Sequence, residues 1–168
     1  RMLPSDPGGR IEVRRLVDWF NVKLFDEVSG HLVTEKVFKR YMTPAQGGGA
    51  PDMAAIRAAR SNIRYHLAYI GWLISSRNWL AGDRLSYADL AAAAQLSVVD
   101  YLGDVPWQEN DAAKHWYARV KSRPSFRPLL SDRRGWCVFI GTPKGKNAFY
   151  DLWKQALADP DWFSLTPK

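Results

Sequence analysis

One short stretch near the end of the chain has the residue types of a phosphate-binding loop. Gly141 and Gly145 enclose three residues, Lys146 follows directly, and Asn147 comes next. A phosphate loop has four residues between its glycines, then a lysine, then a serine or threonine whose hydroxyl holds Mg²⁺. The spacing here is one residue short and an amide replaces the hydroxyl. The match is therefore weak, and we expect no nucleotide hydrolysis from this stretch.

Other catalytic and metal-binding chemistry has little support. The single cysteine, Cys137, can form neither an internal disulfide nor a cysteine-built metal site. The three histidines, at positions 31, 66 and 115, lack the i, i+4 spacing of a helical metal site. Asp89 could be proposed as a catalytic carboxylate, but Ser86 three residues earlier makes a structural role in a helix cap the better interpretation. We therefore predict no catalytic residue and no metal site.

Five aromatic residues fall on the first half of the chain, where two long helices are expected. They could line a hydrophobic substrate pocket, or they could belong to the core or to a subunit interface. The sequence leaves these alternatives open. The five residues are Trp19, Phe20, Tyr65, Tyr69 and Trp72.

Charged residues near one end of the same two helices form a candidate binding surface. Arg57, Arg60 and Arg64 lie along one flank of the second helix, and Glu35 lies near the end of the first. An ordinary solvated face is the simpler interpretation. The alternative is a docking surface for an acidic protein partner, because arginine forms bidentate contacts with carboxylates.

Hydrophobic spacing predicts the two helices that must position these residues. From Ile11 onward, apolar residues recur at intervals of three and four, which predicts one helix running to about Met42. Three glycines in the segment 43–51 end it. A second helix then opens with Pro51 near its first turn, where the missing N–H costs nothing. Two long helices with a short connection form an antiparallel hairpin.

A helix start with reciprocal caps follows the hairpin. Ser86 can accept a hydrogen bond from the first turn, Asp89 can reach back to the N–H of Ser86, and Leu85 can pack on Leu90 across the start. This pattern is a capping box with a hydrophobic staple. The helix behind it contains "LAAAAQLSVV" and is apolar on nearly every side, which predicts burial at the centre of the domain. A fourth helix is expected over residues 111–122.

The pattern changes near Arg133. Residues 136–141, "WCVFIG", predict a buried strand, and a helical pattern follows the glycine-lysine loop. We therefore divide the chain into a linker over residues 1–9, a helical domain over 10–132 and an appendage over 133–168. The predicted fold class is all-α, with a short strand-loop-helix appendage at the C-terminus.

Charge and hydropathy narrow the range of partners. The net charge is +7, but the positive excess is spread along the chain without a dense basic run, so we expect no nucleic-acid partner. No apolar run approaches the roughly 18 residues of a membrane-spanning helix, and the N-terminus has no apolar signal core. We expect a cytoplasmic protein without membrane contact.

The helical hairpin, the Ser86 and Asp89 capping box and the closing segment "WYARVKSRPSF" together resemble the C-terminal domain of glutathione transferases over about residues 10–132. In that family the capping box and staple nucleate the domain. The segments "EVRRLVDWF" and "YIGWLISSRNWLAGD" are similar to one branch, the glutathione-transferase-like division proteins of alphaproteobacteria. Those proteins bind the tubulin-like polymer FtsZ and are not known for transferase chemistry. The resemblance implies a glutathione-transferase-like helical bundle that is a non-catalytic protein-binding module with FtsZ as partner.

The resemblance also implies what this chain lacks. A complete member has an N-terminal thioredoxin-like domain that binds glutathione and supplies the catalytic residue. Because helical signal begins here at residue 11, we expect no cofactor, no glutathione site unless that domain is restored, and no conjugation by this chain alone. The alternative is a fragment of an authentic transferase that contributes the substrate pocket. The usual family homodimer also uses that domain, so the oligomeric state stays open.

Residues 135–168 resemble a different family, the large subunit of phage terminases, at the Gly-Thr-Pro-Lys-Gly loop that follows the predicted strand. In that family the loop couples ATP hydrolysis to DNA movement. A terminase-type ATPase fragment is therefore a third hypothesis, which depends on this tail alone.

Overall fold

The computed structural model describes residues 2–126, which consist of helices and the turns and loops that join them. Several features predicted from sequence lie outside these described residues. They are the boundary near Arg133, the strand over residues 136–141 and the phosphate-loop-like residues Gly141, Gly145 and Lys146.

A long helical rod begins the described chain. It consists of α1 (Pro7–Asp18), η1 (Trp19–Ser29) and α2 (Gly30–Lys36). The rod starts earlier than predicted because Asp6 caps it, accepting a hydrogen bond from the N–H of Gly9 at 2.6 Å. Pro7 occupies the first helical position, where a missing N–H is harmless. The predicted linker over residues 1–9 was therefore wrong for residues 7–9.

The middle of the rod, η1, is a π-helix, in which the N–H of Gly30 donates to the carbonyl of Phe25 five residues back. Buried positions recur here every four residues, a repeat that drifts by about 40° per step around an α-helix. The wider π turns oppose that drift and keep the repeat on the core side. These residues are Leu16, Phe20, Leu24, Val28 and Leu32. After Lys36 only a 3₁₀ turn, η2 (Phe38–Arg40), follows, so the predicted helix to Met42 was too long.

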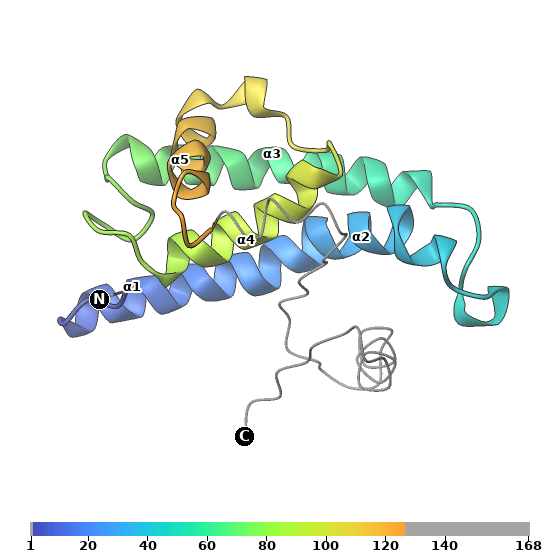
Figure 1. Ribbon diagram of the computed structural model, residues 1–168, viewed down its shortest axis with the longest axis horizontal. Helices are drawn as coiled ribbons and strands as arrows, with labels where there is room; N and C mark the ends of the chain where they lie inside the picture. The colour runs from blue at the N-terminus through green and yellow to red at the C-terminus, as the bar shows by residue number, and fades with distance from the viewer. Residues whose placement is uncertain (1, 127–168) are drawn as a thin grey trace. The chain divides into compact units, whose positions relative to one another are not determined.

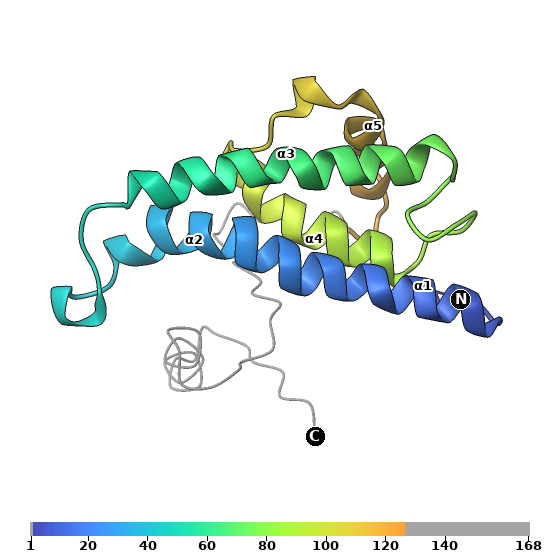
Figure 2. The same cartoon turned by 180° about the vertical axis from the view of Figure 1, so that it is seen from behind.

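The second long helix, α3 (Met53–Ser75), runs back along the rod and forms the predicted antiparallel hairpin (Figures 1 and 2). A 3₁₀ turn, η3 (Pro44–Gln46), lies in the connection. Asp52 is the N-cap of α3, because its carboxylate accepts the N–H of Ala54 at 2.7 Å. Pro51 lies one residue before this cap, near the first turn.

The central helix is α4 (Tyr87–Tyr101), which packs against α1, η1 and α5 (Asp111–Lys121), as Figure 1 shows. Ala88, Ala92 and Ala93 of this helix are fully buried, and their small side chains let these neighbours approach closely. Leu90 of the predicted staple packs on the core cluster and Leu85 is half-buried; their mutual contact stays a prediction. Residues 2–126 contain no strand, only an isolated bridge between Trp79 and Gly82. The all-α fold class is confirmed.

Candidate functional site

One side of α3 gathers most of the residues proposed for binding. Its exposed side chains recur at intervals of three and four, so they share one helix face, which the other described residues leave open to solvent. We call this set the outer face of α3. It consists of Arg57, Ser61, Arg64, Tyr65, Ala68 and Trp72.

Ion pairs fix the arginines along one flank of this face. Arg60 Nε lies 2.7 Å from Asp104 Oδ1, and Lys36 Nζ lies 2.5 Å from Oδ2 of the same carboxylate. Arg64 Nε lies 2.9 and 3.0 Å from the two carboxylate oxygens of Glu109. Asp104 is buried, whereas the arginine head groups remain partly exposed. The arginine flank therefore presents positive charge to solvent although each of these carboxylates lies behind or beside it.

The two remaining residues of the predicted docking surface behave differently. Arg57 is exposed and makes no hydrogen bond or ion pair with any residue in the range 2–126. Glu35 is only 7% exposed. Its carboxylate accepts the backbone N–H of Asp52 at 2.6 Å and pairs with Lys39, also at 2.6 Å. Glu35 therefore fastens the start of α3 to the rod, and its prediction as a partner-binding residue was wrong.

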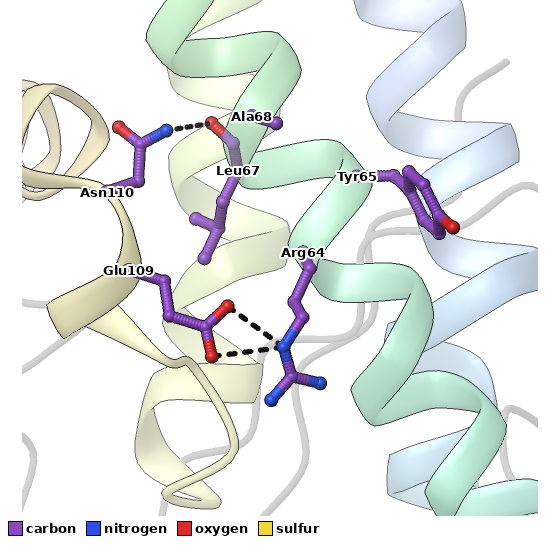
Figure 3. Close-up of a pocket in the computed structure, with 6 residues that line it drawn as sticks. All are labelled: Arg64, Tyr65, Leu67, Ala68, Glu109 and Asn110. Atoms are coloured by element: carbon purple, nitrogen blue, oxygen red, sulfur yellow. Dashed lines mark hydrogen bonds and ion pairs between the residues drawn. The ribbon is translucent and has the colours of Figure 1, made fainter.

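An open pocket of about 310 Å³ lies beside the outer face, between α3 and the 3₁₀ turn η4 (Trp107–Glu109). Figure 3 shows the Arg64 and Glu109 ion pair bridging the two elements, while the Asn110 Nδ2 group donates to the carbonyl of Leu67 at 3.2 Å. Tyr65 points to the opposite side of α3 from Glu109. The pocket thus has charged and amide groups at its rim and apolar surface between them. Its lining residues are Arg64, Tyr65, Leu67, Ala68, Glu109 and Asn110.

The five aromatic residues do not surround a common cavity. Phe20 is fully buried in the core, so its prediction as a pocket residue was wrong. Trp19 and Tyr69 have ring centroids 4.8 Å apart, and Tyr69 and Trp72 stack at 6.0 Å with nearly parallel rings. Trp72 is 62% exposed and Tyr65 is 75% exposed. Tyr65, Tyr69 and Trp72 form an aromatic flank of the outer face of α3, across from the arginines.

Ser86 and Asp89 form a capping box at the start of α4. The Ser86 Oγ accepts the N–H of Ala88 at 3.3 Å, and Asp89 Oδ2 accepts the N–H of Ser86 at 2.9 Å. Asp89 Oδ1 accepts two further bonds, from the N–H of Leu80 at 3.0 Å and from Nε1 of Trp116 at 2.9 Å. Since this carboxylate is fully buried and its oxygens are occupied, Asp89 has a structural role rather than a catalytic one.

His66 is a buried polar residue for which sequence spacing predicted no specific partner. Trp19 Nε1 donates to His66 Nδ1 at 3.2 Å, and His66 Nε2 lies 2.9 Å from the Glu27 carboxylate, which also pairs with Lys23. These partners join the π-helix η1 to α3. Burial lowers the pKa of the imidazole below its ordinary value, although the Glu27 carboxylate opposes this effect. A neutral ring with its proton on Nε2 satisfies both hydrogen bonds.

We expect the domain to lose stability when the pH falls below about 6.5, because the unfolded histidine then binds a proton more readily than buried His66 does. The urea midpoint should be lower at about pH 5.5 than at about pH 7.5. In a His66→Gln variant, which cannot titrate here, this difference should shrink. An unchanged difference in that variant would assign the pH dependence to other groups.

The described part of the chain contains no candidate metal site and no candidate membrane-spanning helix. Among residues 2–126, no three His, Cys, Asp or Glu side chains come together in a way that could hold a metal ion. No helix in that range is long and apolar enough to cross a membrane.

The helical hairpin and the buried, capped central helix correspond to a known domain. The family model described as glutathione S-transferase, C-terminal domain, matches residues 31–124, more than half of the chain. The chain belongs to the glutathione S-transferase family. The matched range includes α3, α4 and α5, and with them the outer face of α3.

Several known proteins are similar to this chain in sequence as well as in fold. FtsZ-localized protein A from Caulobacter vibrioides (strain NA1000 / CB15N) is 54% identical over 132 residues, which are 79% of this chain and 56% of that protein. The crystal structure of a glutathione S-transferase from Sinorhizobium meliloti 1021 matches with a TM-score of 0.76 and 58% identity, covering 79% of this chain and 58% of that one. The structure of FzlA from C. crescentus matches with a TM-score of 0.73 and 50% identity, covering 89% and 62%. The chain therefore spans between 56% and 62% of the length of these proteins.

Proposed function

We propose that this chain is a non-catalytic protein-binding module that associates with FtsZ in bacterial cell division. The observation that carries the proposal is the 54% identity with FtsZ-localized protein A over 132 residues. Identity at this level over most of the chain favours a shared partner, whereas remote members of the family share only the fold. On this proposal the protein works in the cytoplasm, and a homodimer of the longer protein remains a further expectation.

The competing hypothesis is that the chain supplies the substrate pocket of a glutathione-conjugating enzyme. Family membership favours it, but the candidate residues fit it poorly. Phe20 lies inside the core, and Tyr65 and Trp72 are widely exposed rather than enclosed. Small-molecule sites usually bury most of their ligand. Asp89, the one carboxylate considered for catalysis, already accepts bonds on both oxygens. No step of glutathione chemistry is assigned to the described residues.

The terminase-type ATPase hypothesis gains no support. The family match covers residues 31–124, whereas that hypothesis depends on residues 135–168. The loop spacing and the missing hydroxyl ligand already disfavour phosphate binding.

We expect the 168-residue chain to sediment with FtsZ polymers assembled in GTP and to stay in the supernatant with FtsZ in GDP. The measurement is ultracentrifugation at fixed FtsZ and increasing chain concentration. A chain that stays in the supernatant in both nucleotides would contradict the proposal.

An enzyme assay separates the two hypotheses. The chain can be fused to the portion of the Sinorhizobium meliloti relative that the match leaves uncovered. Conjugation of glutathione to a chloronitrobenzene electrophile by this fusion, without sedimentation of the chain with FtsZ, would favour the transferase hypothesis. Sedimentation without turnover favours the binding module.

A further inference from the structure

We propose that the outer face of α3 binds an acidic protein segment that carries an apolar side chain. This inference deepens the proposed function and rests on it for the identity of the partner, which would be FtsZ. The surface and the chemistry of its ligand follow from the described side chains alone.

Exposed aromatic surface is the first reason. Tyr65 and Trp72 are 75% and 62% exposed, and they lie seven residues apart, which is two turns, on the same side of α3. Trp72 stacks on Tyr69, which in turn contacts Trp19, so the ring is held in place although its outer surface faces water. Rigid exposed aromatic rings are typical centres of protein interfaces, because they bury large apolar area at little cost in side-chain entropy.

The charge of the arginine flank is the second reason. Four cations lie on or next to the outer face; in the described residues the carboxylates of Asp104 and Glu109 pair with three of them, and Asp52 interacts with the fourth, Arg57, without a direct ion pair. Asp104 is 1% exposed, so it neutralises its partners from behind and offers no negative surface to a ligand. Arg57 makes no hydrogen bond or ion pair within residues 2–126, and its charge interacts only at longer range with the Asp52 carboxylate. The four cations are Lys36, Arg57, Arg60 and Arg64. Charge complementarity therefore selects an acidic occupant.

The arrangement of the two flanks is the third reason. The helical positions place the arginines on the side of α3 that faces η4, and Figure 3 shows Tyr65 on the other side. Ser61 and Ala68 lie between the flanks, where their small side chains let another backbone approach the helix closely. A segment lying along α3 would meet arginine on one side and aromatic rings on the other. The open pocket over Ala68 can receive one apolar side chain. This combination favours a protein ligand with both carboxylates and an apolar residue over a purely anionic polymer.

Two single variants test the two flanks without disturbing the fold. Arg57→Glu reverses a charge that makes no intramolecular bond in the described range, and Trp72→Ala removes a mostly exposed ring. Matched controls lie at the start of α4, away from α3. Arg84→Glu reverses an exposed charge, and Tyr87→Ala removes a ring that is 50% exposed. The urea midpoint of each variant shows whether it is folded.

The first probe is FtsZ assembled in GTP, and the readout is the apparent Kd from sedimentation of the full chain. We expect Arg57→Glu and Trp72→Ala each to weaken binding about tenfold, and the controls to change it by less than about twofold. The effect of Arg57→Glu should diminish as salt is raised, because exposed charges are screened, whereas that of Trp72→Ala should persist.

The second probe is a fluorescein-labelled synthetic peptide of glutamate and leucine residues, followed by anisotropy, with a lysine and leucine peptide as control. We expect only the acidic peptide to bind, and both α3 variants to weaken it. Binding of this peptide through α3 without sedimentation of the chain with FtsZ would uphold the surface and refute the proposed partner. Sedimentation with FtsZ that neither α3 variant weakens, together with no binding of the acidic peptide, would overturn the inference and leave the proposed function standing.

Discussion

Replacement of Asp89 by alanine is expected to lower the free energy of unfolding by about 3 to 5 kcal/mol, the largest loss that we predict for any single side chain. The carboxylate is fully buried and accepts bonds from Leu80 N–H, Ser86 N–H and Trp116 Nε1. Alanine would leave these three donors, and the Ser86 hydroxyl that also donates to Oδ2 at 3.0 Å, without this acceptor. An unpaired buried donor costs its full desolvation free energy, which is more than the net contribution of the hydrogen bond.

Urea denaturation at about pH 7.5 measures this loss, and a series of variants shows where it comes from. Asp89→Asn keeps the size of the side chain and one acceptor oxygen, so its loss should be intermediate. Ser86→Ala removes the cap oxygen at Ala88 and the hydroxyl that donates to Asp89 Oδ2, and it should cost about 1 kcal/mol. Asp83→Ala, at an exposed position, should change stability by less than about 0.5 kcal/mol. An Asp89→Ala loss no greater than that of Ser86→Ala would show that the bonds to Leu80 and Trp116 contribute nothing.

The capping box could be predicted from sequence because it is local. Ser86 and Asp89 are three residues apart, and the geometry of a helix start fixes which N–H groups lie within reach. The bonds from Asp89 to Leu80 and Trp116 could not be predicted, because they depend on how a loop and α5 pack around α4. The local pattern identified the residue, and tertiary packing supplies most of its contribution to stability.

The errors have a related cause. Helical spacing shows which residues share a face, but it does not show which face is covered. Phe20 falls on the covered face of the rod, and Glu35 turns inward to the start of α3. His66 has apolar neighbours in sequence, and its partners Trp19 and Glu27 come from another helix. The arginines were placed correctly on one flank because helical spacing alone fixes which residues share a flank.

The second large loss of stability that we expect is at Asp104. Helical spacing did not single out this residue, because its role depends on which face of the fold is covered. Asp104 lies just beyond the C-terminal end of α4 and its side chain is 1% exposed. It pairs with Lys36 of α2 and with Arg60 of α3, and Lys36 also donates to the carbonyl of Leu102, the C-cap of α4, at 2.9 Å. Three helices therefore meet at this one carboxylate, whereas Asp89, at the other end of α4, joins α4 to a loop and to α5.

Asp104→Ala is expected to lower the free energy of unfolding by about 2 to 4 kcal/mol, because it leaves partly buried Lys36 without its counter-ion. The loss should be smaller than for Asp89→Ala, since the head groups of Arg60 and Lys36 can turn toward water. Urea denaturation measures it, with Asp83→Ala again as the exposed control.

A double-mutant cycle shows whether the ion pair itself is responsible. Lys36→Met keeps the aliphatic stem and removes the charge, so Asp104→Ala should cost less in that background than in the parent. Equal costs in the two backgrounds would assign the loss to packing or to Arg60 instead. Because Asp104 also orients Arg60 beside the outer face of α3, Asp104→Asn should weaken sedimentation with FtsZ less than Arg57→Glu does, although it destabilises the fold more. This opposite ranking of stability and binding would separate the residues that hold α4 in place from those that meet the partner.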